Sequence, residues 1–153
     1  MKKSPLLDVA IELNIGFLLG NSNRIKERLL DQYLQPANIT ASQAKVLFHI
    51  YRLSNMRQCD IGKKLGVDNS AVTRMIDRLE KKNLLQRLPS ETDRREVLIT
   101  LTEEGAELVS DVSELANAAI EELCSPLSTE ETETLRTLLR KLIANHSIDC
   151  LGK

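Results

Sequence analysis

The sequence predicts a mainly α-helical fold with a small β-hairpin wing, namely a winged helix-turn-helix flanked by dimerisation helices from both chain ends. Three observations support this fold class. Residues 57–80 contain two short helical segments joined by a turn at Gly66, which is the pattern of a helix-turn-helix. Two short apolar segments, residues 84–88 and 97–101, follow directly and enclose a polar loop, as in a β-hairpin. The segments outside this unit are long and apolar at helical spacing.

The second helix of the helix-turn-helix has one apolar and one polar face. Val72, Ile76 and Leu79 keep the i, i+4, i+7 spacing that buries one stripe of a helix, and Asp68 stands at the N-cap position. The other face carries hydroxyls first and charged side chains further along: Ser70, Thr73, Arg74, Asp77, Arg78 and Lys81. Such a face can simply keep a helix soluble. Beside a turn and a hairpin, it is typical of a helix that enters a major groove.

Capping signals predict where the other helices begin. Thr40 and Gln43 form a capping box, in which each side chain accepts the backbone N–H of the other residue. Thr102, followed by two glutamates, predicts a further N-cap with acids in the first turn. Ser128 with Glu131 predicts a second capping box.

The terminal segments carry more apolar residues than one buried stripe needs. The helix expected over about residues 5–33 is apolar nearly all round, so it must be covered on several sides. In a chain of 153 residues, a partner subunit is the expected cover. We therefore expect dimerisation helices in residues 1–37 and 102–147, the winged helix-turn-helix domain in residues 38–101, and a C-terminal tail in residues 148–153.

The net charge of −1 conceals a strong asymmetry along the chain. Residues 1–55 hold seven Lys/Arg and four Asp/Glu, and residues 56–100 hold ten and seven. Residues 101–153 hold four and eleven, so the basic excess of the first two segments is masked by an acidic third. This split predicts a cationic contact surface with an acidic remainder.

Other function classes find little support. The chain has two histidines, no phosphate-binding glycine loop, no nucleophile elbow and no paired metal-ligand motif, so we expect neither an enzyme nor a bound metal or cofactor. Cys59, Cys124 and Cys150 are odd in number and widely spaced, which predicts no disulfide framework, and Cys59 is expected to be a buried structural residue. The uncharged run at residues 13–23 is too short to span a bilayer, which predicts a cytoplasmic protein.

Several motifs resemble the MarR (multiple antibiotic resistance regulator) family of bacterial transcription factors. The similarity is carried by residues 67–68, 71–79, 87–89, 93–95 and 97–102, and upstream by residues 28–34 and 39–47. It covers roughly residues 13–143 in the right order. The wing's Asp-x-Arg followed by the Leu-Thr helix start is the specific part, because a helix-turn-helix pattern alone is weak evidence.

The pattern and the resemblance together predict the DNA contacts. They are Gln43, Ser70, Thr73, Arg74, Arg78, Asp93, Arg94 and Arg95. Arg74 and Arg78, spaced i, i+4, can point into one groove, although Arg78 could instead form a surface ion pair. Arg95 is the minor-groove residue, held by Asp93, and Arg94 contacts phosphate or solvent. Gln43 either contacts DNA, as its family equivalent does, or only completes the helix cap.

The resemblance also implies a ligand-responsive homodimer. Thr73, Met75, Arg78 and Arg87 match positions that touch ligand in similar proteins, although Met75 is equally well a core residue and Arg87 a surface residue. The implied regulator is a repressor on a pseudo-palindromic operator, released by a salicylate-like phenolic anion. Lys81 departs from a relative that carries a metal-oxidised cysteine there. The alternatives are a redox- or metal-responsive regulator of the same fold and a winged-helix protein-interaction module.

Overall fold

The computed structural model describes residues 14–90 and 96–144 and confirms the predicted fold class. Within these residues six α-helices accompany one short 3-10 helix and a small sheet. The elements are α2 (Ile15–Leu34), η1 (Gln35–Ala37), α3 (Ala41–Leu53), β1 (Met56–Arg57), α4 (Gln58–Leu65), α5 (Asn69–Lys81), β2 (Leu85–Pro89), β3 (Val97–Leu101), α6 (Glu103–Cys124) and α7 (Thr129–Ala144).

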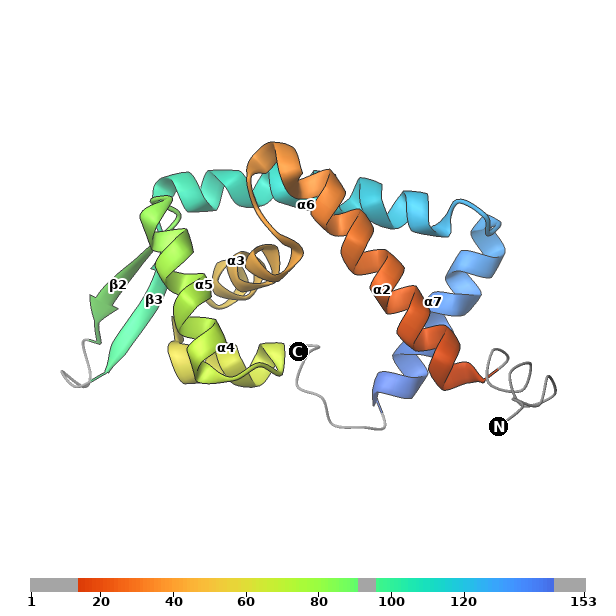
Figure 1. The fold of residues 1–153 in the computed structure, drawn as a ribbon, viewed down its shortest axis with the longest axis horizontal. Coiled ribbons are helices and arrows are strands. Elements are labelled where there is room, and N and C mark those ends of the chain that lie inside the picture. The colour runs from red at the N-terminus through yellow and green to blue at the C-terminus, as the bar shows by residue number, and fades with distance from the viewer. Residues whose placement is uncertain (1–13, 91–95, 145–153) are drawn as a thin grey trace, which may run out of the picture.

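The molecule is elongated, with a winged domain at one end and the terminal helices at the other (Figure 1). Helices α3, α4 and α5 lie beside the strands β2 and β3, and α6 runs from the wing toward the far end, where α7 follows it. Helix α2 packs mainly against α6. None of the helices in these two residue ranges has both the length and the apolar character needed to cross a bilayer.

The predicted capping signals are confirmed. The Thr40 hydroxyl accepts the Gln43 N–H at 3.2 Å, and Gln43 Oε1 accepts the Thr40 N–H at 3.1 Å. The Thr102 hydroxyl accepts a backbone N–H in the first turn of α6, and Ser128 and Glu131 make the reciprocal bonds of a capping box before α7. Helices α3, α6 and α7 thus start where their own side chains satisfy otherwise unpaired backbone donors, whereas α4 begins after Arg57 without a side-chain cap.

The sheet has three strands, whereas the sequence predicts only the two strands of a hairpin. The order is β1-β3-β2, all antiparallel, and Met56 and Arg57 of β1 pair with Ile99 and Leu98 of β3. A strand of two residues is too short to show an alternating pattern. It exists because β3 offers a free edge to the chain that connects α3 to α4.

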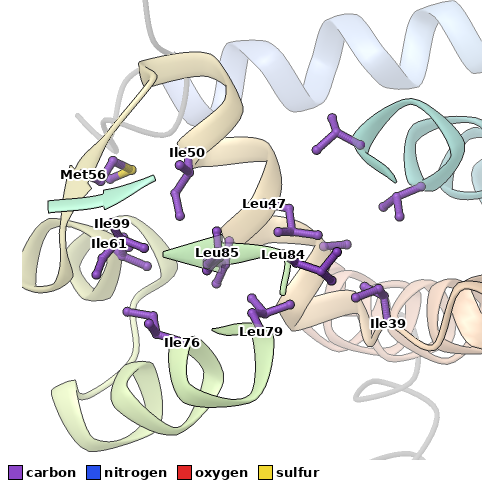
Figure 2. Packing of buried hydrophobic residues seen from close by; sticks show 14 of the residues in the cluster. Ile39, Leu47, Ile50, Met56, Ile61, Ile76, Leu79, Leu84, Leu85 and Ile99 are labelled. Carbon is purple, nitrogen blue, oxygen red and sulfur yellow. The ribbon is translucent and has the colours of Figure 1, made fainter. Parts of the chain in front are cut away.

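The core of the winged domain is built from α3, α4, α5 and the three strands. Val72, Ile76 and Leu79 of α5 are fully buried, as their spacing predicts. Figure 2 shows side chains from the three helices and the sheet converging, among them Leu47 and Ile99. Close packing of this kind holds the outer face of α5 at a fixed angle to the wing.

The start of α6 is pressed against the chain that enters β2. The Thr102 N–H donates to the Leu84 carbonyl at 3.2 Å, and the Thr102 hydroxyl donates to the Asn83 carbonyl at 2.6 Å. A Cβ atom at Gly105 would lie 2.0 Å from the Leu84 carbonyl oxygen. Only glycine therefore permits this approach, which sets the direction in which α6 leaves the winged domain.

The prediction that Cys59 is buried is wrong. Cys59 is exposed, because α4 turns Ile61 and Gly62 toward the core and leaves Cys59 on the outer side. Cys124 is half-buried at the end of α6, and Cys150 lies outside the residues that the structure describes.

Candidate nucleic-acid interface

The outer face of α5 presents two exposed guanidinium groups. Arg74 and Arg78 are both exposed, and neither has a hydrogen-bond or ion-pair partner among residues 14–90 and 96–144. The ion pair that the sequence allowed for Arg78 is thus not formed within these ranges. Because the opposite face of α5 is locked in the core, these two side chains project from a rigid support.

The N-terminus of α5 is closed by its predicted N-cap. Asp68 Oδ1 accepts the backbone N–H of Ala71 at 2.9 Å and the hydroxyl of Ser70. These hydrogen bonds, that from Ser70 above all, lower the pKa of Asp68. The cap therefore stays ionised at neutral pH and holds the exposed Ser70 at the leading end of the helix.

Thr73 is placed between the two helices of the helix-turn-helix. Its Oγ1 accepts a hydrogen bond from Gln58 Nε2 at 2.6 Å and donates to the Asn69 carbonyl at 2.8 Å. Sequence reasoning missed this partnership, since Gln58 and Thr73 are 15 residues apart and only folding brings them together. The bond fixes the position of α4 relative to α5.

Gln43 is 5% exposed, and its side-chain oxygen is used in the cap of α3. The predicted capping box is thus formed, while the contact of Gln43 with DNA stays a prediction. The residue also lines a hollow between α2, the start of α3 and α5.

This hollow consists of two adjoining cavities of about 680 and 370 Å³, which share Asp31, Thr40, Gln43 and Arg78. The larger cavity is lined by Asp31, Gln35, Asn38, Ile39, Thr40, Gln43, Arg78, Lys81 and Lys82. The smaller adds Ser42, Ala71, Arg74 and Met75. Three cations face one carboxylate in the larger cavity, so its charge suits an anion. Thr73 and Arg87 line neither of the two.

Polar contacts tie α2 to the winged domain around this hollow. Asp31 Oδ1 accepts the Ala41 N–H at 2.7 Å, and Lys45 Nζ lies 2.8 Å from Glu27 Oε1. Burial raises the pKa of Glu27, but its hydrogen bonds with Lys45 and Lys26 outweigh this and leave the pKa lowered. The hollow thus lies at the junction between helix α2 and the winged domain.

Arg87 forms ion pairs with two carboxylates of α5. Its Nη2 lies 2.6 Å from Asp77 Oδ1, and its Nη1 pairs with Glu80. The acids are spaced i, i+3 and so face the same strand, β2. That spacing was the available signal for this pairing, which joins α5 to β2.

The base of the wing is described, but the predicted tip residues Asp93, Arg94 and Arg95 lie outside the described residues. At the base, the Ser90 N–H donates to the Glu96 carbonyl at 2.9 Å. Glu96 also pairs with Arg57 at 3.0 Å.

A helix-turn-helix whose second helix displays exposed arginines beside a hairpin defines a winged-helix DNA-binding protein. The sequence model of the MarR family matches residues 39–97. The multiple antibiotic resistance protein MarR of Escherichia coli (strain K12) is 39% identical over 130 residues, which are 84% of this chain and 90% of that protein. Its counterpart in Salmonella typhimurium is 38% identical over the same shares of each chain. The chain therefore belongs to the MarR family.

Solved structures agree with this assignment. Wild-type apo MarR from E. coli superposes with a TM-score of 0.79 at 39% identity, covering 85% of this chain and 97% of MarR. A mutant MarR complexed with operator DNA superposes with a TM-score of 0.78 and covers 91% and 99%. BpsR of Bordetella bronchiseptica, whose DNA binding is regulated by 6-hydroxynicotinic acid, is 27% identical with a TM-score of 0.76, covering 86% and 94%. The chain is a MarR-family transcriptional regulator and not an enzyme.

Proposed function

We propose that the protein is a homodimeric repressor that binds a pseudo-palindromic operator in double-stranded DNA and is released by a small phenolic anion of the salicylate type. The observation that carries the proposal is the pair of exposed guanidiniums of Arg74 and Arg78 on the outer face of α5, which have no partner among the residues that the structure describes. In this assignment α5 is the recognition helix, and its DNA-contacting residues are Ser70, Thr73, Arg74 and Arg78. Gln43, at the start of α3, contacts DNA beside it. The wing residues Asp93, Arg94 and Arg95 complete the contact in the adjacent minor groove.

The terminal helices support a dimer. All sixteen residues of α7 are described and none is buried, although the helix carries Leu135, Leu138, Leu142 and Ile143. The first turns of α2 are equally open, with Ile15 71% exposed and Leu18 50% exposed. An exposed apolar surface of this kind marks an interface. A second copy is the partner proposed, because two-fold pairing would repeat α5 along the duplex and match a pseudo-palindrome.

A Leu138→Glu variant tests this assignment. Leu138 is 55% exposed on α7, so the charge leaves the isolated subunit folded but is desolvated in a dimer interface. We expect this variant to be a monomer in sedimentation and to lose operator binding in gel shifts. The operator itself is first identified by genome-wide mapping of bound DNA in the native host.

Thr137→Glu, on an exposed neighbour in the same helix, is the matched control and should bind as the wild type does. A wild-type protein that stays monomeric at working concentration, or that shows no affinity for duplex DNA at low salt, would refute the proposed function.

The ligand proposal rests on the hollow beside α5. Arg78, Lys81 and Lys82 supply cationic donors there, and Met75 supplies an apolar wall. Arg78 also belongs to the DNA-facing side of α5, so an anion that pairs with its guanidinium competes with DNA for the same group. Such competition gives reciprocal coupling between ligand and operator. The regulation of BpsR by 6-hydroxynicotinic acid supports an aromatic anion. Arg87 is already neutralised by Asp77 and Glu80, so Arg78 is the anion-binding residue that we propose.

Titration calorimetry with salicylate tests the ligand. The wild type should release heat, and Arg78→Ala should bind about ten- to a hundredfold more weakly, because a charge-assisted hydrogen bond is lost. Arg24→Ala removes one positive charge outside the lining of both cavities and should bind salicylate normally. If salicylate produces no heat with the wild type and does not weaken its DNA binding, this ligand class is contradicted.

A further inference from the structure

Arg57 joins three parts of the winged domain. It ends β1, pairs with Leu98 of β3 in the sheet and precedes the first residue of α4. Its Nε donates to Asp60 Oδ2 of α4 at 2.7 Å, and its Nη1 donates to Glu96 Oε1 at 3.0 Å. A single guanidinium therefore connects the first helix of the helix-turn-helix to the base of the wing.

Glu96 stands where the wing leaves the sheet. It directly precedes Val97, which forms the last ladder pair with Pro89, and its carbonyl accepts the Ser90 N–H at 2.9 Å. On one side β3 is held by the five residues of β2, but on the other only by the two residues of β1. Because the edge strand β1 is so short, its backbone pairing holds the hairpin only weakly. An ion pair at Glu96 therefore has a large effect on the orientation of the wing.

The charges at this place are unusual for a surface beside DNA. Glu96 is an acid at the wing's base, where it would repel phosphates, and Arg57 is taken up by two carboxylates instead of being offered to the duplex. These hydrogen bonds, that from Arg57 to Asp60 first, raise the pKa of Arg57 and lower that of Asp60, so both stay charged. These carboxylates weaken the attraction of this surface to DNA phosphates. What the cluster can provide is a fixed orientation of the wing relative to α4.

We propose that Arg57, clamped between Asp60 and Glu96, is a positioning residue that fixes the angle of the wing relative to α4 and α5 and thereby strengthens operator binding. The proposal rests on the proposed function, in which the wing contacts DNA. It assigns Arg57 no contact with DNA of its own.

Glu96→Gln separates positioning from simple electrostatics. Removing an acid near DNA raises affinity if only charge matters. If Glu96 anchors the wing, gel shifts on operator should show an affinity lower by up to about fivefold, the upper end for an exposed ion pair. Glu107→Gln, on an exposed acid of α6 with no partner among the described residues, reports the effect of net charge alone. Operator affinity of Glu96→Gln equal to or above that of Glu107→Gln overturns the proposal.

Arg57→Gln distinguishes positioning from a phosphate contact. The loss of one phosphate contact lowers the slope of log K against log salt by about one. We expect weaker binding with an unchanged slope, and a double Arg57→Gln/Glu96→Gln variant no weaker than Arg57→Gln. A reduced slope, or additive losses in the double variant, would show that Arg57 acts on DNA directly. Wild-type protein that fails to bind duplex DNA instead refutes the proposed function, and thermal unfolding of each variant verifies its fold.

Discussion

An Arg74→Ala variant should lose its preference for operator over scrambled duplex. Arg74 is exposed on a helix whose other face is fully buried, and it has no partner within the described parts of the chain, so its guanidinium can reach base edges. A bidentate pair between arginine and guanine discriminates by about 1–3 kcal/mol. Because a dimer makes the contact twice, we expect the ratio of operator to scrambled affinity to fall on the order of 30-fold or more. Competition gel shifts with both duplexes measure this ratio.

Arg95→Ala is the informative comparison. An arginine in the minor groove responds to the width of the groove and to phosphate charge, so its loss should weaken binding to both duplexes with less loss of sequence preference. Unchanged operator binding by both variants would refute the assignment of the recognition helix and wing. If Arg74→Ala lowers the affinity for both duplexes equally, Arg74 contacts phosphate and does not read base sequence.

A Gly105→Ala variant should be the most destabilised single substitution at a glycine. The added methyl would lie 2.0 Å from the Leu84 carbonyl oxygen and 2.9 Å from its carbon, and a backbone group cannot rotate away. The start of α6 must then shift and strain the Thr102 cap. We expect a loss of about 3 kcal/mol in the free energy of unfolding, the upper end for overpacking. Urea unfolding measures it as a lower midpoint at unchanged slope.

Gly20→Ala is the matched control, since a Cβ at Gly20 meets nothing within 4 Å. Inside α2 this change should leave stability unchanged or raise it by about 0.5–1 kcal/mol, because glycine disfavours helix interiors. Equal midpoints for Gly105→Ala and Gly20→Ala would show that the approach of α6 to Leu84 is not required.

Local signals in the sequence were sufficient for most of the helices. The capping box of Thr40 and Gln43 and the N-cap at Asp68 were predictable because both partners lie within three residues of each other. The wing hairpin was predictable for the same reason, although its first strand is observed at residues 85–89 instead of 84–88. The two-residue strand β1 left no pattern, because it depends on an edge supplied some 40 residues later.

Sequence alone therefore determined the winged helix-turn-helix, the buried stripe of α5 and the outward direction of Arg74 and Arg78. These features follow from spacing within single elements. Only the tertiary structure decided the partners of Arg87, Gln58 and Arg57, the exposure of Cys59, and the hollow between α2, α3 and α5. The physical reason is that each of these depends on how separate elements pack, and composition does not encode which long side chain meets which carboxylate across that distance.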